Sequence, residues 1–288
     1  FSLGQMIDQP DTTLMPLDTI GAIQDDWNMY EAEGLLTLGM AWRGMFRNSW
    51  APEEIWRPEF EFARGRKLPL TVHIGTLKSR TGHVEAHYKN KLLGPDVNVV
   101  HACSATADEI KMIAETGATM SVLEQSELRG GWGMPLLSEC LDAGIPTALG
   151  VDSVAIVGNC NLFNLLKIAA GVENVKALSE FKFNARRMLK LGTLDAAKVL
   201  GLDDKIGSLT PGKRADIVIV STDALNMAPY GDPANMLIES TMQENVDNVV
   251  IDGRIVKQGG KLTGIETGEV IRDVQASFND VRQRTAWR

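Results

Sequence analysis

The chain has 288 residues, of which 44% are hydrophobic, 37 are acidic and 29 are basic, which gives a formal charge of −8 at pH 7. This apolar content excludes a disordered chain, and the acidic balance excludes the basic surface that a nucleic-acid-binding protein needs. The sequence has no apolar run near the roughly 18 residues that a membrane helix requires, so we expect no membrane association.

Cysteine usage indicates a reducing compartment. Cys103, Cys140 and Cys160 are odd in number and far apart, which favours free thiols over a disulfide framework. We therefore expect a cytoplasmic protein. The sequence leaves the oligomeric state open, with a homo-oligomer as one alternative.

Short apolar segments recur along the first half of the chain, each bounded by turn residues. Helix-like segments separate them, and Thr106 with Glu109 forms the signature of a capping box. This rhythm predicts repeated βα units, and the near-continuous apolar character predicts a parallel sheet in an α/β fold. The expected strands are 34–40, 68–74, 97–103, 119–124 and 145–151.

The pattern changes after Asp152. A β section follows the next helices, with a strand at 215–221 and a hairpin at 248–256 whose Asp252-Gly253 pair fits a type I′ turn. A last helix at 266–283 has an apolar stripe that we expect to dock on the body of the protein. The helices expected between Asp152 and the β section are 160–171, 178–190 and 193–200.

Three side chains that can bind a metal ion or move a proton follow three different strands. His73 and His101 lie near the ends of two strands, and Asp152 directly follows the last one. The C-terminal ends of parallel barrel strands open onto one face, so we expect these three side chains to converge. Alternatively, each histidine is a hydrogen-bonded core residue and Asp152 is a helix N-cap.

Further histidine, tryptophan and arginine residues are of the types that could contribute to the same site. His83 and His87 are four residues apart and could chelate zinc from one helix face, but the motif His-Glu-x-x-His is absent and we favour a solvated helix surface. Trp42, Arg43 and Trp132 are candidates for substrate contact.

The stretch 193-TLDAAKVLGLDDKIGSLTPGKRADIVIV-220 resembles the signature with which the amidohydrolase superfamily re-enters its small β domain. The resemblance is to the branch of cytosine deaminases, adenosylhomocysteine deaminases and triazine hydrolases, and it covers nearly the whole chain. Segments 68–76, 99–103 and 149–153 resemble the fifth, sixth and eighth barrel strands of that superfamily.

The resemblance implies a (β/α)8 TIM-type barrel, of which this chain holds strands 4–8, with part of a small β-sandwich domain. Residues 1–203 would form the C-terminal portion of a metal-dependent hydrolase barrel, 204–263 the β-sandwich portion and 264–288 a helix docking on the body. We expect the complete protein to carry the earlier strands.

The resemblance also implies one divalent metal ion, Zn²⁺ with Fe²⁺ as the alternative, and a bound water as nucleophile. His73, Asp152 and His101 are the implied metal ligands. Asp152 would also take the proton of the water, and His101, as the alternative to ligating the metal, would orient or polarise the substrate. A bound zinc ion lowers the pKa of water to about 7, which makes hydroxide available near neutral pH.

The sequence departs from that family at three places. The chain has no His-x-His pair, Thr76 stands where deaminases of this branch carry a glutamate, and Val122 stands where a histidine would align. Thr76 is retained as a substrate-binding candidate, but its hydroxyl cannot act as an acid near neutral pH.

The sequence therefore predicts a metal-dependent hydrolase that cleaves a C–N bond of a small cyclic or aromatic molecule. The bond would be an amide, a urea-like bond or the bond to an amino group on a ring. Two alternatives remain: a catalytically inactive barrel that acts as a binding or structural subunit, and a related dehalogenase or lyase.

Overall fold

The structure is a computed structural model that describes residues 2–3, 13–31, 33–46 and 50–285. The chain divides into two compact units, Phe1–Ser208 and Leu209–Arg288. Each unit is described by itself. The C-terminal helix belongs to the second unit.

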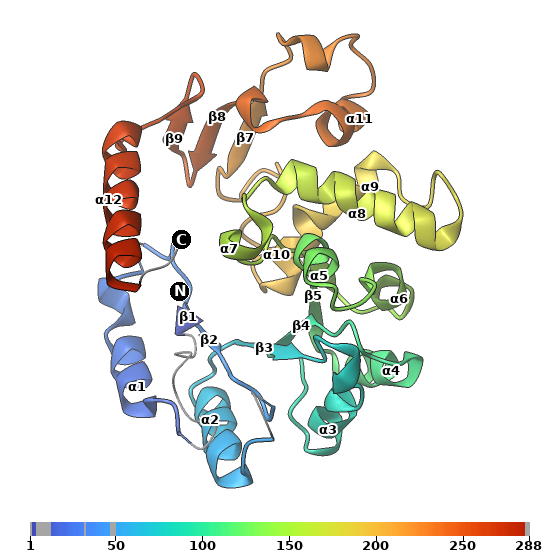
Figure 1. Ribbon diagram of the computed structural model, residues 1–288, viewed down its shortest axis with the longest axis vertical. Coiled ribbons are helices and arrows are strands. Elements are labelled where there is room, and N and C mark those ends of the chain that lie inside the picture. Colours follow the sequence, from blue (N-terminus) through green and yellow to red (C-terminus); the bar gives the residue numbers. More distant parts are fainter. Residues whose placement is uncertain (1, 4–12, 32, 47–49, 286–288) are drawn as a thin grey trace. The chain divides into compact units, whose positions relative to one another are not determined.

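The first unit contains a parallel sheet whose six strands are neighbours in chain order. In Figure 1 the strands form an arc, with helices α2, α3, α4 and α6 along its outer side. The parallel sheet confirms the predicted α/β class. The strands are β1 (Ser2–Leu3), β2 (Gly39–Ala41), β3 (Leu70–Ile74), β4 (Val97–His101), β5 (Thr119–Val122) and β6 (Thr147–Leu149).

The first predicted strand is wrong over most of its length. The segment 34–40 enters the sheet only at Gly39, because Glu33 and Gly34 adopt left-handed φ values of 60° and 79° and form a turn. A further short strand, β1, pairs with β2 through Ser2 opposite Gly39.

Helices follow the strands as the βα rhythm predicts. The predicted capping box is confirmed: Thr106 Oγ1 accepts the Glu109 N–H at 3.2 Å, and Glu109 Oε2 accepts the Thr106 N–H at 3.0 Å. The helices of this unit are α1 (Leu17–Asp25), α2 (Glu53–Gly65), α3 (His83–Lys89), α4 (Ala107–Thr116), α5 (Glu124–Gly130), α6 (Leu137–Asp142), α7 (Val154–Val157), α8 (Leu162–Ala177), α9 (Ala185–Leu191) and α10 (Leu194–Val199), with 3₁₀ turns η1 (Trp27–Met29) and η2 (Lys78–Arg80).

Burial alternates along β3. Leu70, Val72 and Ile74 are buried, whereas Thr71 and His73 are exposed. Successive side chains of a strand point to opposite faces, so the buried face packs towards the helices and His73 lies on the other face. This confirms the alternation predicted from the sequence.

The second unit contains an antiparallel sheet in the order β10-β9-β8-β7. The predicted type I′ hairpin is supported by φ values of 49° at Asp252 and 77° at Gly253. The elements of this unit are β7 (Ile217–Val220), η3 (Leu225–Met227), α11 (Pro233–Asn235), the π-helical η4 (Met236–Ser240), η5 (Gln243–Asn245), β8 (Val246–Ile251), β9 (Arg254–Gln258), β10 (Lys261–Leu262) and α12 (Thr267–Thr285).

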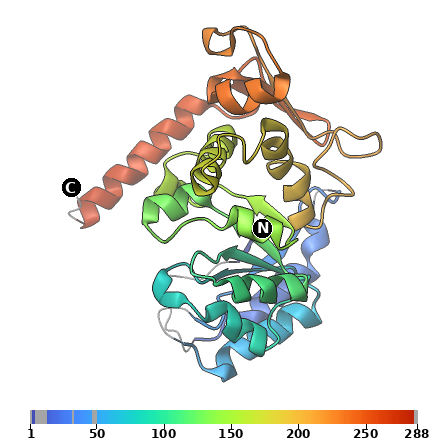
Figure 2. The same cartoon turned by 90° about the vertical axis from the view of Figure 1, so that its right-hand side faces the viewer.

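Helix α12 is a single unbroken helix (Figure 2). Its predicted apolar stripe is 41% to 64% exposed, so the docking expected from the sequence stays a prediction. Across the described ranges of the chain, no helix combines the length and apolarity needed to cross a membrane. The stripe consists of Val270, Ile271, Val274, Phe278 and Val281.

Candidate active site

Three strand ends bring together the residues predicted to form the site. His73 is the fourth residue of β3, His101 is the last residue of β4, and Asp152 follows β6 by three residues. Because the strands are parallel and in chain order, their C-terminal ends share one edge of the sheet.

The three side chains are close in space. The rings of His73 and His101 have their centroids 5.2 Å apart. The Nε2 atom of His101 lies 4.0 Å from Oδ2 of Asp152. This Oδ2 atom is buried and has no hydrogen-bond partner in the part of the chain that the structure describes.

The backbone at this edge is strained. His101, Ala102 and Asp152 have φ values of 75°, 50° and 66°, in the left-handed region. For residues other than glycine, that conformation costs about 1–2 kcal/mol each. Strain of this kind persists where the surrounding structure fixes it, and it clusters at functional sites.

Two residues of the β5–α6 region hold the His101 ring. Glu127 of α5 accepts a hydrogen bond from His101 Nδ1 at 3.2 Å, and the Trp132 indole meets the imidazole edge to face, with centroids 5.0 Å apart at 81°. The sequence predicts Trp132 as a substrate contact but does not single out Glu127. The only sequence signal for Glu127 is an acidic residue shortly after an apolar strand, which is too common to mark a site.

The charge state of His73 suits a metal ligand. Desolvation by the surrounding protein, followed by the nearby His101, lowers the pKa of His73 below 6.5, and the Asp152 carboxylate opposes this shift. His73 is therefore neutral at pH 7, as a ligating imidazole must be.

The donor types at this edge fit a divalent metal ion such as zinc, which binds imidazole nitrogen and carboxylate oxygen. The unpartnered Oδ2 of Asp152 beside His101 Nε2 is the arrangement that a bound cation would satisfy. Among the described residues, however, no group of three or more His, Cys, Asp or Glu side chains is already arranged to hold a metal.

Two predicted substrate contacts lie elsewhere. Trp42 is 2% exposed and packs against Phe60 of α2, with ring centroids 5.1 Å apart. Arg43 is buried in an ion pair with Glu59 of α2. Both side chains turn from the strand end into the helix layer, so their placement argues against contact with a substrate. Thr76, two residues beyond β3, is buried at the same edge as His73.

The prediction that His83 and His87 lie on a solvated helix surface is wrong. His83 is 6% exposed and His87 is 1% exposed. His87 is fixed by two backbone groups, since its Nδ1 donates to the His83 carbonyl at 2.7 Å and its Nε2 accepts the Met45 N–H at 3.3 Å. Burial lowers the pKa of His87 to about 4, so it is a neutral core residue.

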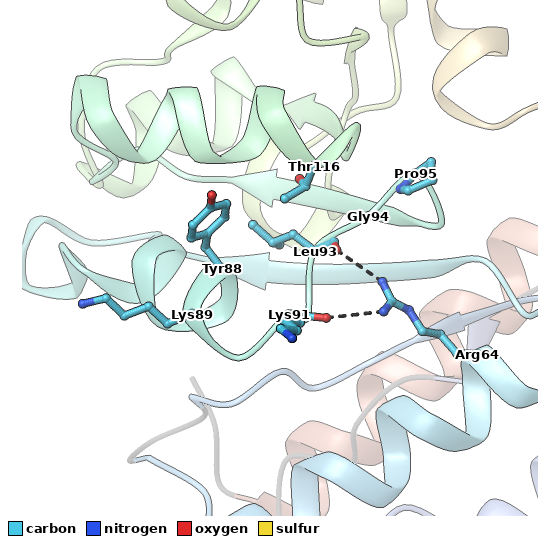
Figure 3. Close-up of a pocket in the computed structure, with 8 residues that line it drawn as sticks. All are labelled: Arg64, Tyr88, Lys89, Lys91, Leu93, Gly94, Pro95 and Thr116. Carbon is cyan, nitrogen blue, oxygen red and sulfur yellow. Dashed lines mark hydrogen bonds between the residues drawn. The ribbon is translucent and has the colours of Figure 1, made fainter.

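A surface hollow of about 550 Å³ lies at the opposite edge of the sheet (Figure 3). Gly94 and Pro95 line it just before β4 begins, and the Arg64 guanidinium donates to the carbonyls of Lys91 and Leu93 at 3.3 Å each. This hollow therefore lies at the amino ends of the strands, at the opposite edge of the sheet from His101.

Histidine and aspartate side chains at the carboxyl edge of a parallel α/β sheet lie where barrel enzymes build their active sites. A model of the amidohydrolase family matches residues 69–256. The chain belongs to the amidohydrolase family. The fold predicted from the sequence is thereby confirmed.

Curated relatives of the chain include deaminases. The chain is 27% identical over 224 residues to a 5'-deoxyadenosine deaminase of Methanobrevibacter smithii, covering 74% of this chain and 52% of that protein. It is 29% identical over 177 residues to a 5-methylthioadenosine/S-adenosylhomocysteine deaminase of Acetivibrio thermocellus, covering 61% of this chain and 41% of that protein. The chain thus spans about half the length of the curated relatives that it matches.

A similar solved structure is an adenosine deaminase from Xanthomonas campestris with bound zinc. The TM-score is 0.83 at 21% identity, and the match covers 92% of this chain and 62% of that chain. At this identity the likeness shows a shared fold.

Proposed function

We propose that this protein is a metal-dependent hydrolase that cleaves a C–N bond of a small ring-containing molecule with a metal-activated water. The observation that carries the proposal is the facing pair of His101 Nε2 and Asp152 Oδ2, 4.0 Å apart at the carboxyl edge of the sheet. Membership of the amidohydrolase family and the deaminase relatives support it.

His73, His101 and Asp152 would hold one divalent ion, with zinc favoured by the donor types. Such an ion, when bound, supplies a water whose pKa is lowered to about 7. The zinc-bound adenosine deaminase of similar fold supports the choice of metal.

Asp152 would move the proton. Its Oδ2 atom has no competing hydrogen bond in the described structure, so it can accept a proton from the water and pass it to the leaving nitrogen. His101 would hold the ion through Nε2, because Glu127 occupies its other ring nitrogen.

The residues around these groups bear on the substrate class. The Trp132 indole beside His101 offers an apolar surface on which a ring can pack. Thr76 can donate a hydrogen bond but cannot protonate a ring nitrogen near neutral pH, so amide or urea-like bonds are favoured over deamination of a ring.

A second candidate is a barrel that binds small molecules without catalysis. It is favoured by the fact that the described residues hold no ready group of three ligands. The two candidates differ in metal content and turnover.

The test is zinc content and hydrolysis by the complete protein, with Asp152→Asn as the variant and Asp108→Asn as the control. Asp108 is exposed and pairs with Lys111 on α4. General acid and base groups contribute roughly 10²- to 10⁴-fold, so Asp152→Asn should lower kcat by that factor and Asp108→Asn should not. Unchanged hydrolysis in Asp152→Asn would overturn the mechanism, and absence of metal would favour the binding barrel.

We also propose a reducing, cytoplasmic setting, which the free thiols of Cys103, Cys140 and Cys160 support. A small molecule is the proposed partner. The protein is also proposed to form a homo-oligomer, and light scattering would measure its oligomeric state.

A further inference from the structure

The Glu127 carboxylate is buried and contacts His101 of the proposed site. Glu127 is fully buried, and its Oε1 atom accepts hydrogen bonds from His101 Nδ1 at 3.2 Å and from the Leu123 N–H at 2.9 Å. The second bond ties the carboxylate to the backbone at the end of β5. Glu127 is therefore held in place independently of His101.

The same residue also anchors the loop that covers the His101 ring. The backbone N–H of Trp132 donates to the backbone carbonyl of Glu127 at 3.0 Å. The Trp132 indole lies edge to face against the His101 imidazole. The segment 127–132 thus contacts both the Nδ1 atom of His101 and its ring.

We infer that Glu127 is a positioning residue, which holds the proton of His101 on Nδ1 and keeps Nε2 unprotonated and directed at Asp152. An ionised carboxylate only accepts hydrogen bonds, so the contact selects the Nδ1–H form of a neutral imidazole. Carboxylate partners of this kind orient metal-ligating histidines and raise their basicity. The inference rests on the proposed function for its purpose, but the tautomer itself does not depend on a metal.

The first measurement is the tautomer of His101 in the metal-free protein, by ¹⁵N-histidine NMR at about pH 8, above the ordinary histidine pKa of about 6.5. Only four histidines contribute signals, and His101→Gln assigns the relevant one. His87 is an internal reference, because its two backbone hydrogen bonds fix it as Nδ1–H. We expect His101 to be Nδ1–H, and an Nε2–H signal would overturn the inference.

The second measurement is zinc affinity in the variants Glu127→Leu and Glu127→Gln. The leucine removes the acceptor, so His101 should populate both tautomers and the zinc dissociation constant should rise roughly 10- to 100-fold. The glutamine keeps an acceptor oxygen, so this variant should retain the Nδ1–H tautomer of His101 and the zinc affinity. Unchanged tautomer and zinc affinity in Glu127→Leu would overturn the inference.

Glu124→Leu is the matched control, because Glu124 is an equally buried acid on the same helix α5. We expect it to leave the His101 tautomer unchanged. If Glu124→Leu shifts the tautomer as Glu127→Leu does, helix packing is the cause and the positioning role is refuted. If the unsubstituted protein binds no zinc, the proposed function fails, whereas the tautomer measurement still decides the role of Glu127.

Discussion

The Oδ2 atom of Asp152 lies 4.0 Å from the Nε2 atom of His101, although β4, which ends at His101, and β6, which precedes Asp152, are not neighbours. Strand β5 separates β4 from β6 in the sheet, and it contributes no histidine at its end. Both residues of this pair have left-handed backbone, with φ of 75° and 66°.

We expect Asp152→Asn to raise the melting temperature of the metal-free protein while weakening zinc binding. A buried polar atom without a partner costs about 1–3 kcal/mol, and the new amide can donate to His101 Nε2. Asparagine also tolerates the left-handed backbone. Thermal unfolding with and without zinc tests this, and a lower melting temperature in the metal-free variant would contradict it.

We expect Gly130→Ala to move Trp132 away from His101. A Cβ atom at Gly130 would lie 2.5 Å from the Trp132 indole, so the ring must shift. The near-ultraviolet circular dichroism of the protein should change, and substrate affinity should fall if Trp132 packs on the ring of the substrate. Gly171→Ala in α8 is the control, since its Cβ meets nothing within 4 Å and should stabilise the helix by about 0.5–1 kcal/mol. An unchanged spectrum in Gly130→Ala would refute the prediction.

Arg43→Met should lower the free energy of unfolding by about 3–5 kcal/mol, because it breaks the buried ion pair between Arg43 and Glu59. Arg57→Met, which breaks an exposed pair with Glu53 on α2, should cost about 0.3–0.5 kcal/mol. Urea unfolding measures both values. Equal losses of unfolding free energy in the two variants would show that the buried Arg43–Glu59 pair contributes no more than the exposed pair.

Stability should fall as the pH rises from about 4.5 to about 8 because of Glu124. Burial, followed by the neighbouring Glu173 and Glu127, raises the pKa of Glu124 to about 8 from 4.5, and Lys176 opposes this. Between these values the folded state holds a proton that the unfolded chain has released, so deprotonation favours unfolding.

Glu124→Gln should flatten this slope in urea unfolding at a series of pH values, because the amide does not titrate. The control is Glu61→Gln, an exposed residue on α2. A slope that persists unchanged in Glu124→Gln would assign the pH dependence to other groups.

Local sequence signals determined much of the fold. The apolar strand segments from β3 onwards, the Thr106 capping box and the Asp252-Gly253 turn depend on nearby residues, so their patterns are visible in the chain itself. The same reasoning placed His73, His101 and Asp152 at strand ends, because a parallel sheet brings its carboxyl ends to one edge.

Tertiary structure decided which polar side chains face that edge. Trp42 and Arg43 follow a strand yet pack against α2, and His87 lies on a short helix yet is buried and accepts the Met45 N–H. Glu127 of α5 reaches the His101 ring although 26 residues separate the two in the chain. Such contacts join residues far apart in the chain, and burial of each depends on neighbours that no local pattern encodes.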